Sequence, residues 1–155
     1  MSFKLPRECR SYFSRFIGSG TKGKLETLFD EYYICLMLGF ARGRTDEEPD
    51  LEPSEFYRSF PADYKESGYF VSALLIATEV IYNEVNVSDE GELENLITKI
   101  IDPQAESKLS DYGIDLLNIY ASVGMDIIKS EMLEHINLEE FYQEYFEWFD
   151  RSELI

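Results

Sequence analysis

The sequence predicts an all-α fold, a single-domain helical bundle of about five to seven helices formed by residues 1–155. Three observations support this prediction. Apolar residues recur at helical spacing along most of the chain, polar segments with proline or glycine separate these stretches, and no two strand-like runs are joined by hairpin turn residues. The length suits one domain, and the 45% of hydrophobic residues, which include eleven Tyr and eleven Phe, suffice for one aromatic-rich core.

The N-terminal part, residues 1–24, is expected to form a basic helix and a loop. Apolar residues alternate with arginines at helical spacing over residues 6–17, and three glycines then interrupt the pattern within residues 18–24. A second helix is expected over residues 24–41. Its apolar residues occupy most sides of the helix, which is typical of a helix enclosed by others.

An acidic linker loop is expected at residues 42–54, because this segment has two prolines, one glycine and five acids but almost no apolar residues. Ser54 is a candidate N-cap for a short helix that Pro61 ends. Gly68 is expected to open an apolar helix over residues 69–85. This helix carries polar residues and is shorter than a bilayer-spanning helix, so a buried helix is predicted and no membrane contact is expected.

The next helices are predicted from their ends. Asp89 and Glu92 have the three-residue spacing of a capping box, and Pro103 is expected to stop the helix that follows them. A further helix is predicted over residues 110–135, with a bend or a break near Gly124.

The last predicted helix carries the candidate partner-binding residues. Asn137 and Glu140 repeat the capping-box spacing, and aromatic residues follow along one side of the helix. Aromatic rings are favoured interface anchors, although a C-terminal helix commonly docks onto its own domain, and docking is the favoured interpretation here. The candidates for partner contact are Phe141, Tyr145, Trp148 and Phe149.

Charge divides the chain after residue 44. Residues 1–44 hold eight Lys and Arg against four Asp and Glu, whereas residues 45–155 hold six against twenty-seven. A half this acidic repels bare nucleic acid and anionic membranes, and it attracts basic protein surfaces. The charge pattern therefore predicts a larger basic protein as the partner.

The cysteine usage predicts a cytoplasmic protein. Cys9 and Cys35 lie in apolar, helix-like surroundings without CxxC spacing, and the N-terminus has no apolar run that ends in a cleavage site. Both thiols are expected to be reduced.

The segment GSGTKGK, residues 18–24, matches the first seven positions of a phosphate-binding P-loop. The eighth position is Leu25, so the Ser or Thr hydroxyl that holds magnesium is missing. No buried strand is predicted before the segment. A cationic interhelical turn is the favoured interpretation, and no cofactor is expected.

No catalytic constellation is recognisable in the sequence, so a non-enzymatic protein is predicted. The one histidine, His135, belongs to no His or Cys cluster, and the acidic residues 46–52 lack the glycine turn and terminal glutamate of a calcium loop. No metal site is therefore expected.

Two alternative functions stay open at this point. The first is direct nucleic-acid binding by N-terminal cations and nearby aromatic rings, in one copy of the chain or in a homo-oligomer that gathers several such segments. The residues concerned are Arg7, Arg10, Arg15, Lys22 and Lys24. Salt bridges between these cations and acids would disfavour this function. The second alternative is an acidic DNA-mimic inhibitor of a DNA-binding enzyme, which needs a continuous ridge of carboxylates.

The stretch LETLFDEYYICLMLGFARGR, residues 25–44, resembles small accessory proteins of bacterial DNA-modification and restriction gene clusters, in particular those that accompany DNA phosphorothioation. The resemblance rests on hydrophobic character and on Gly39. It implies a small non-catalytic subunit of an antiviral defence or DNA-processing complex. Together with the charge pattern, it predicts a non-enzymatic acidic interaction module that docks on a larger nucleic-acid-handling protein.

Overall fold

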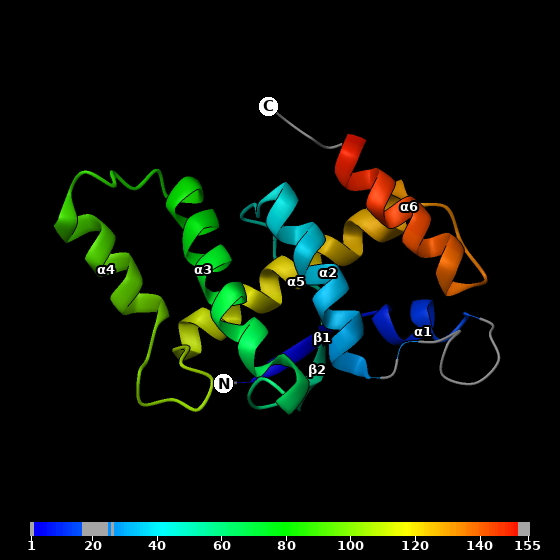
Figure 1. The fold of residues 1–155 in the computed structure, drawn as a ribbon, viewed down its shortest axis with the longest axis horizontal. Helices are drawn as coiled ribbons and strands as arrows, with labels where there is room; N and C mark the ends of the chain where they lie inside the picture. The colour runs from blue at the N-terminus through cyan, green and yellow to red at the C-terminus, as the bar shows by residue number, and fades with distance from the viewer. Residues whose placement is uncertain (1, 17–24, 26, 152–155) are drawn as a thin grey trace.

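Helix α5 (Asp111–Glu131) runs through the centre of the molecule, and the other elements pack around it (Figure 1). The computed structural model describes residues 2–16, 25 and 27–151. The expected predominance of helices is confirmed. In chain order, the elements of the described residues are β1 (Phe3–Pro6), α1 (Cys9–Phe13), α2 (Leu28–Arg42), β2 (Leu51–Tyr57), the 3-10 helix η2 (Ala62–Tyr64), α3 (Lys65–Tyr82), α4 (Glu90–Ile100), α5 and α6 (Leu138–Arg151).

Helices α2 and α5 cross so closely that their backbones touch. A Cβ atom on Gly39 of α2 would lie 1.8 Å from the carbonyl oxygen of Tyr120, and one on Gly124 of α5 would lie 1.7 Å from that of Cys35. The break expected near Gly124 is wrong, because α5 is one continuous helix from Asp111 to Glu131. Gly124 permits a close helix crossing instead.

Two short strands correct the expectation that no strands form. β1 and β2 pair antiparallel, with Phe3 opposite Tyr57 and Pro6 opposite Leu51. The linker loop expected up to residue 54 therefore ends before Leu51. The short helix expected from Ser54 to Phe60 does not form, since β2 extends to Tyr57 and residues 58–60 are irregular. The basic N-terminal helix is shorter than expected, since among residues 2–16 the α-helix extends from Cys9 to Phe13. The strands are far apart in the sequence, so the sequence has no hairpin turn from which their pairing could be predicted.

A buried amide holds the N-terminal strand against the helices. The Asn118 side chain donates to the carbonyl of Ser2 at 3.2 Å. Its oxygen accepts from the Tyr32 hydroxyl at 2.8 Å and from the Lys4 backbone N–H at 3.0 Å. Asn118 is 2% exposed, and these contacts satisfy its polar atoms inside the core.

Most predicted helix ends are close to the observed ones. The Asp89 side chain accepts from the backbone of Gly91 and Glu92, so the predicted cap of α4 is confirmed. The Asn137 side chain likewise accepts from the Glu140 backbone at 2.8 Å, next to the start of α6. Helix α3 begins at Lys65, so Gly68 lies inside the helix and does not precede it as expected. The Phe60 ring packs against Gly68 so closely that a Cβ atom there would lie 2.9 Å from a ring carbon.

The buried apolar side chains form one continuous cluster that reaches from β1 to α6. Its N-terminal part joins Phe3 to Phe29 of α2, with ring centroids 5.4 Å apart. Another part joins Phe13 of α1 to Phe141 of α6, with centroids also 5.4 Å apart. Aromatic contacts therefore connect the first and last helices. Among the described residues, no helix combines the length and apolar character that a membrane span requires.

Candidate docking groove

An open groove of about 820 Å³ lies between α2, α3 and α6. Helix α2 runs between the other two helices in the view of Figure 1. Nearly all lining residues are apolar or aromatic. They are Tyr33, Ile34, Met37, Phe40, Ala41, Leu74, Thr78, Tyr142, Tyr145, Phe146, Phe149 and Asp150.

Helix α6 forms one wall because one side of the helix is anchored in the core. The Tyr145 hydroxyl donates to the Ile34 carbonyl of α2 at 3.1 Å, which fixes the distance between the two helices. On the groove side, Phe146 is 63% exposed, while Tyr142 and Phe149 are half-buried. Within the part of the chain that the structure describes, nothing covers the open side of these rings, and large rings are the side chains that contribute most in interfaces.

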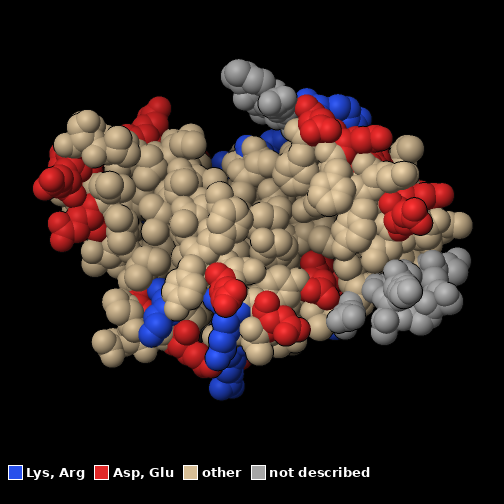
Figure 2. All heavy atoms as spheres, viewed as in Figure 1, with Lys and Arg blue, Asp and Glu red and all other residues tan. Residues whose placement is uncertain are grey.

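Helix α3 forms the other wall, and its outer face extends the apolar surface. Residues 67–78 contain no charged side chain. Tyr69, Phe70 and Ile81 are 72%, 56% and 77% exposed. The space-filling view shows a broad uncharged area across the middle of this face, with the coloured side chains mainly around it (Figure 2). An uncharged area of this extent on a protein of net charge −17 is typical of an interaction surface.

Acidic residues flank the groove at both ends. Asp30 lies one helical turn before Tyr33 on α2, and its charge acts on Tyr142, whose pKa is raised by burial and then by Asp30. Asp150 lines the other end. Arg42, near the C-terminal end of α2, is paired with Glu131 at 2.7 Å and lies over the Trp148 ring. Asp150 is the one charged residue among those that line the groove, while Arg151 next to it lies 4.0 Å from Glu144.

The structure divides the four predicted partner-binding residues. Phe141, Tyr145 and Trp148 are 0%, 6% and 3% exposed. The Trp148 indole N–H donates to Glu131 at 3.2 Å. Phe141 and Trp148 therefore belong to the core of this structure, in line with the favoured interpretation that the last helix docks onto its own domain. Phe149 lines the groove, and so does the rim of Tyr145.

Sequence reasoning missed the contributions of α2 and α3 to the groove. Both helices were expected to be enclosed, because apolar residues surround most of their circumference. In the structure, Met37 and Leu74 are only half-buried, although each helix also has a fully buried side. The available signal was this surplus of apolar residues, which exceeds what one core-facing side needs.

The candidate nucleic-acid-binding arginines are all paired with acids. Arg7 contacts Asp50 at 3.0 Å, Arg10 contacts Glu52 at 2.9 Å, and Arg15 contacts Glu134 at 3.3 Å. Lys22 and Lys24 lie outside the described residues. The described arginines therefore do not form a cationic patch free of carboxylates, which disfavours direct nucleic-acid binding.

The P-loop-like segment at residues 18–24 also lies outside the described residues. Its described surroundings are α1 before it and α2 after it. The sheet of the described residues consists of two antiparallel strands, whereas a P-loop follows a strand of a parallel sheet. The surroundings therefore differ from those of a nucleotide-binding fold.

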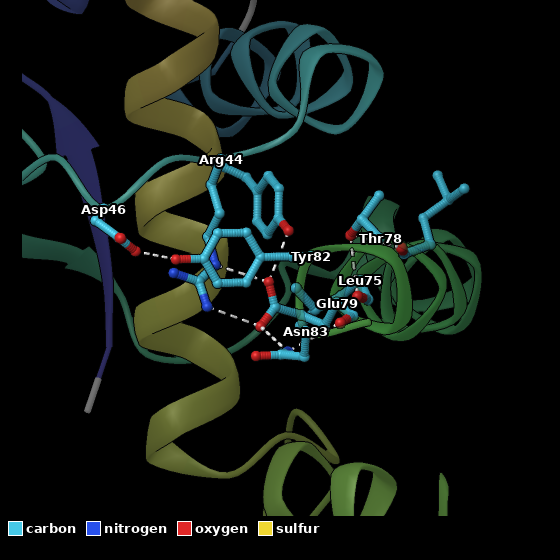
Figure 3. A network of polar contacts seen from close by, with 9 residues as sticks. Arg44, Asp46, Leu75, Thr78, Glu79, Tyr82 and Asn83 are labelled. Carbon is cyan, nitrogen blue, oxygen red and sulfur yellow. Dashed lines mark hydrogen bonds and ion pairs between the residues drawn. The ribbon is translucent and has the colours of Figure 1, made fainter. Parts of the chain in front are cut away.

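The carboxylate of Glu79 is buried beside the groove and forms hydrogen bonds with Arg44, Tyr120 and Asn83 (Figure 3). Glu79 of α3 is 0% exposed and accepts two hydrogen bonds from Arg44, at 2.7 and 2.9 Å. The Tyr120 hydroxyl donates a third at 2.7 Å, and the Asn83 amide donates at 3.3 Å. Burial raises the pKa of Glu79, but the bonds from Arg44 and Tyr120 outweigh it and lower the pKa below its usual value.

Arg44 is itself enclosed in this network. Its guanidinium lies 3.7 Å from the centre of the Tyr82 ring, and the Tyr82 hydroxyl donates to Asp46. The network connects the segment after α2 with α3 and α5. Glu79 is fully buried at the centre of this network, Asp46 and Asn83 lie at its exposed edge, and the contacts of Glu79 and Arg44 within it hold α3 beside α2 and α5.

In the part of the chain that the structure describes, His135 and the acidic residues are not arranged as a metal site. The His135 ring contacts Glu144 through Nε2 at 2.7 Å. No group of three or more His, Cys, Asp or Glu residues there is arranged to hold a metal ion. On the face in Figure 2, Asp and Glu form separate groups and no continuous ridge. A DNA-mimic surface gains no support from this face.

Comparisons with known proteins identify no relative. No protein-family model matches the chain, and the searches of curated proteins and of solved structures find no match either.

Proposed function

We propose that this protein is a non-enzymatic interaction module that binds an amphipathic helix of a larger, basic protein in the groove between α2, α3 and α6. The observation that carries the proposal is the groove itself, which is lined mainly by apolar and aromatic side chains, with Asp150 at one end and Asp30 near the other. The rings supply apolar contact, and the acids orient the bound helix.

The shape of the groove supports a helix as the bound segment. From Tyr33 to Ala41, the α2 part of the groove extends over about 12 Å, which is roughly two turns of a bound helix. Two walls and a floor made of helices accept the apolar side of a further helix at i, i+3, i+4 and i+7 positions. The exposed Phe146 and Phe70 then contact the flanks of that helix.

The charges support a basic partner. Asp30 and Asp150 lie near opposite ends of the groove, and Lys or Arg at both ends of the bound apolar stretch would complement them. The net charge of −17 adds long-range attraction for a basic protein and repulsion for a second copy of this chain. The affinity is therefore expected to fall as salt increases.

The partner is proposed to be a protein that handles nucleic acid, possessing the basic surface that such proteins use to bind phosphates. The resemblance of residues 25–44 to accessory proteins of DNA-modification and restriction clusters supports the same class. In this proposal, the module contributes docking and the partner contributes the chemistry.

Binding of matched synthetic peptides to the full chain tests the proposal. The probe is an amphipathic helical peptide of about 15 residues with an apolar side and Lys at both ends, and the control peptide has Glu at those positions. Fluorescence anisotropy is expected to show saturable binding of the basic peptide only. Phe146→Glu, which places a charge in the groove, is expected to weaken binding at least about tenfold.

Val87→Glu is the matched control, because Val87 is 59% exposed and is not among the residues that line the groove. It adds the same charge and is expected to leave peptide affinity unchanged. Equal binding of both peptides, or equal loss in both variants, would show that general charge effects dominate and would contradict the proposal. Pull-downs from nuclease-treated host extract with the same two variants then identify basic partners that depend on Phe146.

A further inference from the structure

The two cysteines of the chain meet in the core. Cys9 on α1 and Cys35 on α2 have their Sγ atoms 3.9 Å apart, and both side chains are 0% exposed. Both are free thiols. The sulfurs are in direct contact, so a disulfide requires side-chain rotation and a shift of the short helix α1 to bring them to about 2.05 Å.

A carboxylate lies beside this thiol pair. Glu31 lies one turn before Cys35 on α2, and the pKa shifts of Glu31 and Cys9 each include an effect of the other, so the two side chains lie close together. The Oε1 atom of Glu31 is buried without a hydrogen-bond partner. Contact with Cys35 and burial raise the pKa of Cys9, so its thiol needs a nearby proton acceptor in order to react as a thiolate. Glu31 is in position to be that acceptor.

A surface hollow leads toward the same sulfurs. It has a volume of about 280 Å³ and is lined by Tyr12 of α1, by Arg15 just after α1, and by Met125 and Lys129 of α5. Met125 is 2% exposed, and its Sδ lies 3.9 Å from the Cys35 Sγ. The Met125 side chain therefore separates the hollow from the thiol pair, and a small rearrangement at this side chain opens a route for a small oxidant.

We propose that Cys9 and Cys35 are a redox modification site, at which hydrogen peroxide forms an intramolecular disulfide that links α1 to α2. This inference does not depend on the docking groove. In the first step, Cys9 transfers its proton to Glu31 and the thiolate attacks a peroxide oxygen. The O–O bond breaks, Cys9 becomes a sulfenic acid, and the other oxygen leaves as water after taking up a proton.

In the second step, Cys35 attacks the Cys9 sulfur. The S–S bond forms, and the sulfenic oxygen leaves as water with the Cys35 proton. Two thiols are thus oxidised by two electrons, while one peroxide is reduced to two waters. A small thiol such as glutathione reverses the reaction by thiol–disulfide exchange, and two molecules of it are oxidised to their own disulfide.

The disulfide would fasten α1 to the central helices. At present, surface contacts such as the 2.8 Å salt bridge between Glu8 and Lys129 hold one side of α1, and Phe13 packs on Phe141 of α6. A covalent link from Cys9 to Cys35 restricts the unfolded chain between them. It is expected to raise the melting temperature by roughly 10 °C.

Oxidation of the folded full-length protein tests the site. Native protein is treated with hydrogen peroxide, the peroxide is removed, and the protein is unfolded in urea with iodoacetamide and analysed by intact mass and peptide mapping, because both thiols are buried in the folded chain. The expected product has lost two hydrogens, has no alkylatable thiol, contains a Cys9–Cys35 linkage and returns to the dithiol with dithiothreitol. The Met125→Leu variant removes the thioether at similar volume, so that added oxygen at this position does not obscure the result.

Variants separate the proposed roles. Cys9→Ser and Cys35→Ser are expected to form no intramolecular disulfide. Glu31→Gln is expected to slow thiol loss at least about tenfold at neutral pH without preventing the disulfide. Two results would overturn the proposal. In the first, both thiols of protein that was exposed to peroxide while folded are alkylated after unfolding, whereas protein exposed to peroxide in urea is oxidised. In the second, the only disulfides formed connect two molecules.

Discussion

Gly39 of α2 and Gly124 of α5 are the two contact points of one helix crossing. Each glycine faces a backbone carbonyl of the opposite helix, Gly39 that of Tyr120 and Gly124 that of Cys35. Since a carbonyl cannot rotate away as a side chain can, a methyl group at either position forces the helices apart. The crossing also positions Tyr33 and Met37 of α2, which line the groove.

Gly39→Ala and Gly124→Ala are each expected to destabilise the fold by about 3 kcal/mol or more, because the helices must separate and lose core contacts. Urea unfolding followed by circular dichroism measures the change. Gly91→Ala is the control, because Gly91 is exposed in the first turn of α4 and its substitution is expected to stay within about 1 kcal/mol of wild type. Equal effects at all three glycines would contradict the close crossing.

The buried pair of Arg44 and Glu79 gives a second prediction. Arg44→Met or Glu79→Gln alone is expected to destabilise the protein by about 3–5 kcal/mol, since each leaves its partner buried without its charge complement. The double variant is expected to lose clearly less than the sum of the single losses. The coupling energy from a double-mutant cycle in urea checks this, and additive losses would argue against a direct interaction.

The two sides of α6 are expected to respond differently to truncation. Trp148 is 3% exposed and Phe146 is 63% exposed. Trp148→Ala is expected to cost about 3–5 kcal/mol because it leaves a cavity in the core. Phe146→Ala is expected to change stability by less than about 1 kcal/mol while weakening binding of the basic peptide. Thermal unfolding of both variants checks the first difference, and a large loss of stability in Phe146→Ala would contradict its assignment to the groove.

Glu31 makes stability depend on pH. Burial raises its pKa from 4.5 to about 7, a rise that Cys9 and Arg10 of α1 oppose and that Asp30 and Glu52 support. Because the folded pKa lies above the unfolded one, the stabilising contribution of the protonated form is complete below pH 4.5 and is lost as the pH rises through about 7.

Glu31→Gln is therefore expected to gain stability over wild type between about pH 5 and about pH 8, by on the order of 2 kcal/mol after allowance for partial exposure. Unfolding of both proteins across this pH range measures the difference. The exposed Glu94→Gln variant is the control and is expected to show no such trend. A difference that is constant with pH would rule out titration of Glu31 as the cause.

Local sequence patterns predicted most of the helices, because a helix satisfies its hydrogen bonds within one segment. Asp89 and Asn137 were recognisable as caps from the residues next to them. The β1–β2 pairing was missed because its hydrogen bonds join segments far apart in the chain, with no turn between them. The continuity of α5 was missed for a related reason, since the role of Gly124 is set by α2, which the local sequence does not contain.

The candidate site was predictable only in part. The aromatic character of the last helix pointed to residues 141–149, but its sequence did not determine which rings face the core. Tyr145 and Phe149 reached the groove, whereas Phe141 and Trp148 did not. The contributions of α2 and α3 to the groove were not predicted. The helical pattern of apolar residues is the same whether a neighbouring helix covers those residues or leaves them exposed.

The sequence by itself determined the helical character of the chain, the ends of several helices and the division into a basic and an acidic part, since these depend on neighbouring residues and on composition. The tertiary structure alone decided that Arg7, Arg10 and Arg15 pair with distant acids, that Cys9 meets Cys35 and that three helices leave a groove open. Each of these depends on how segments far apart in the chain pack together, and no local pattern encodes that packing.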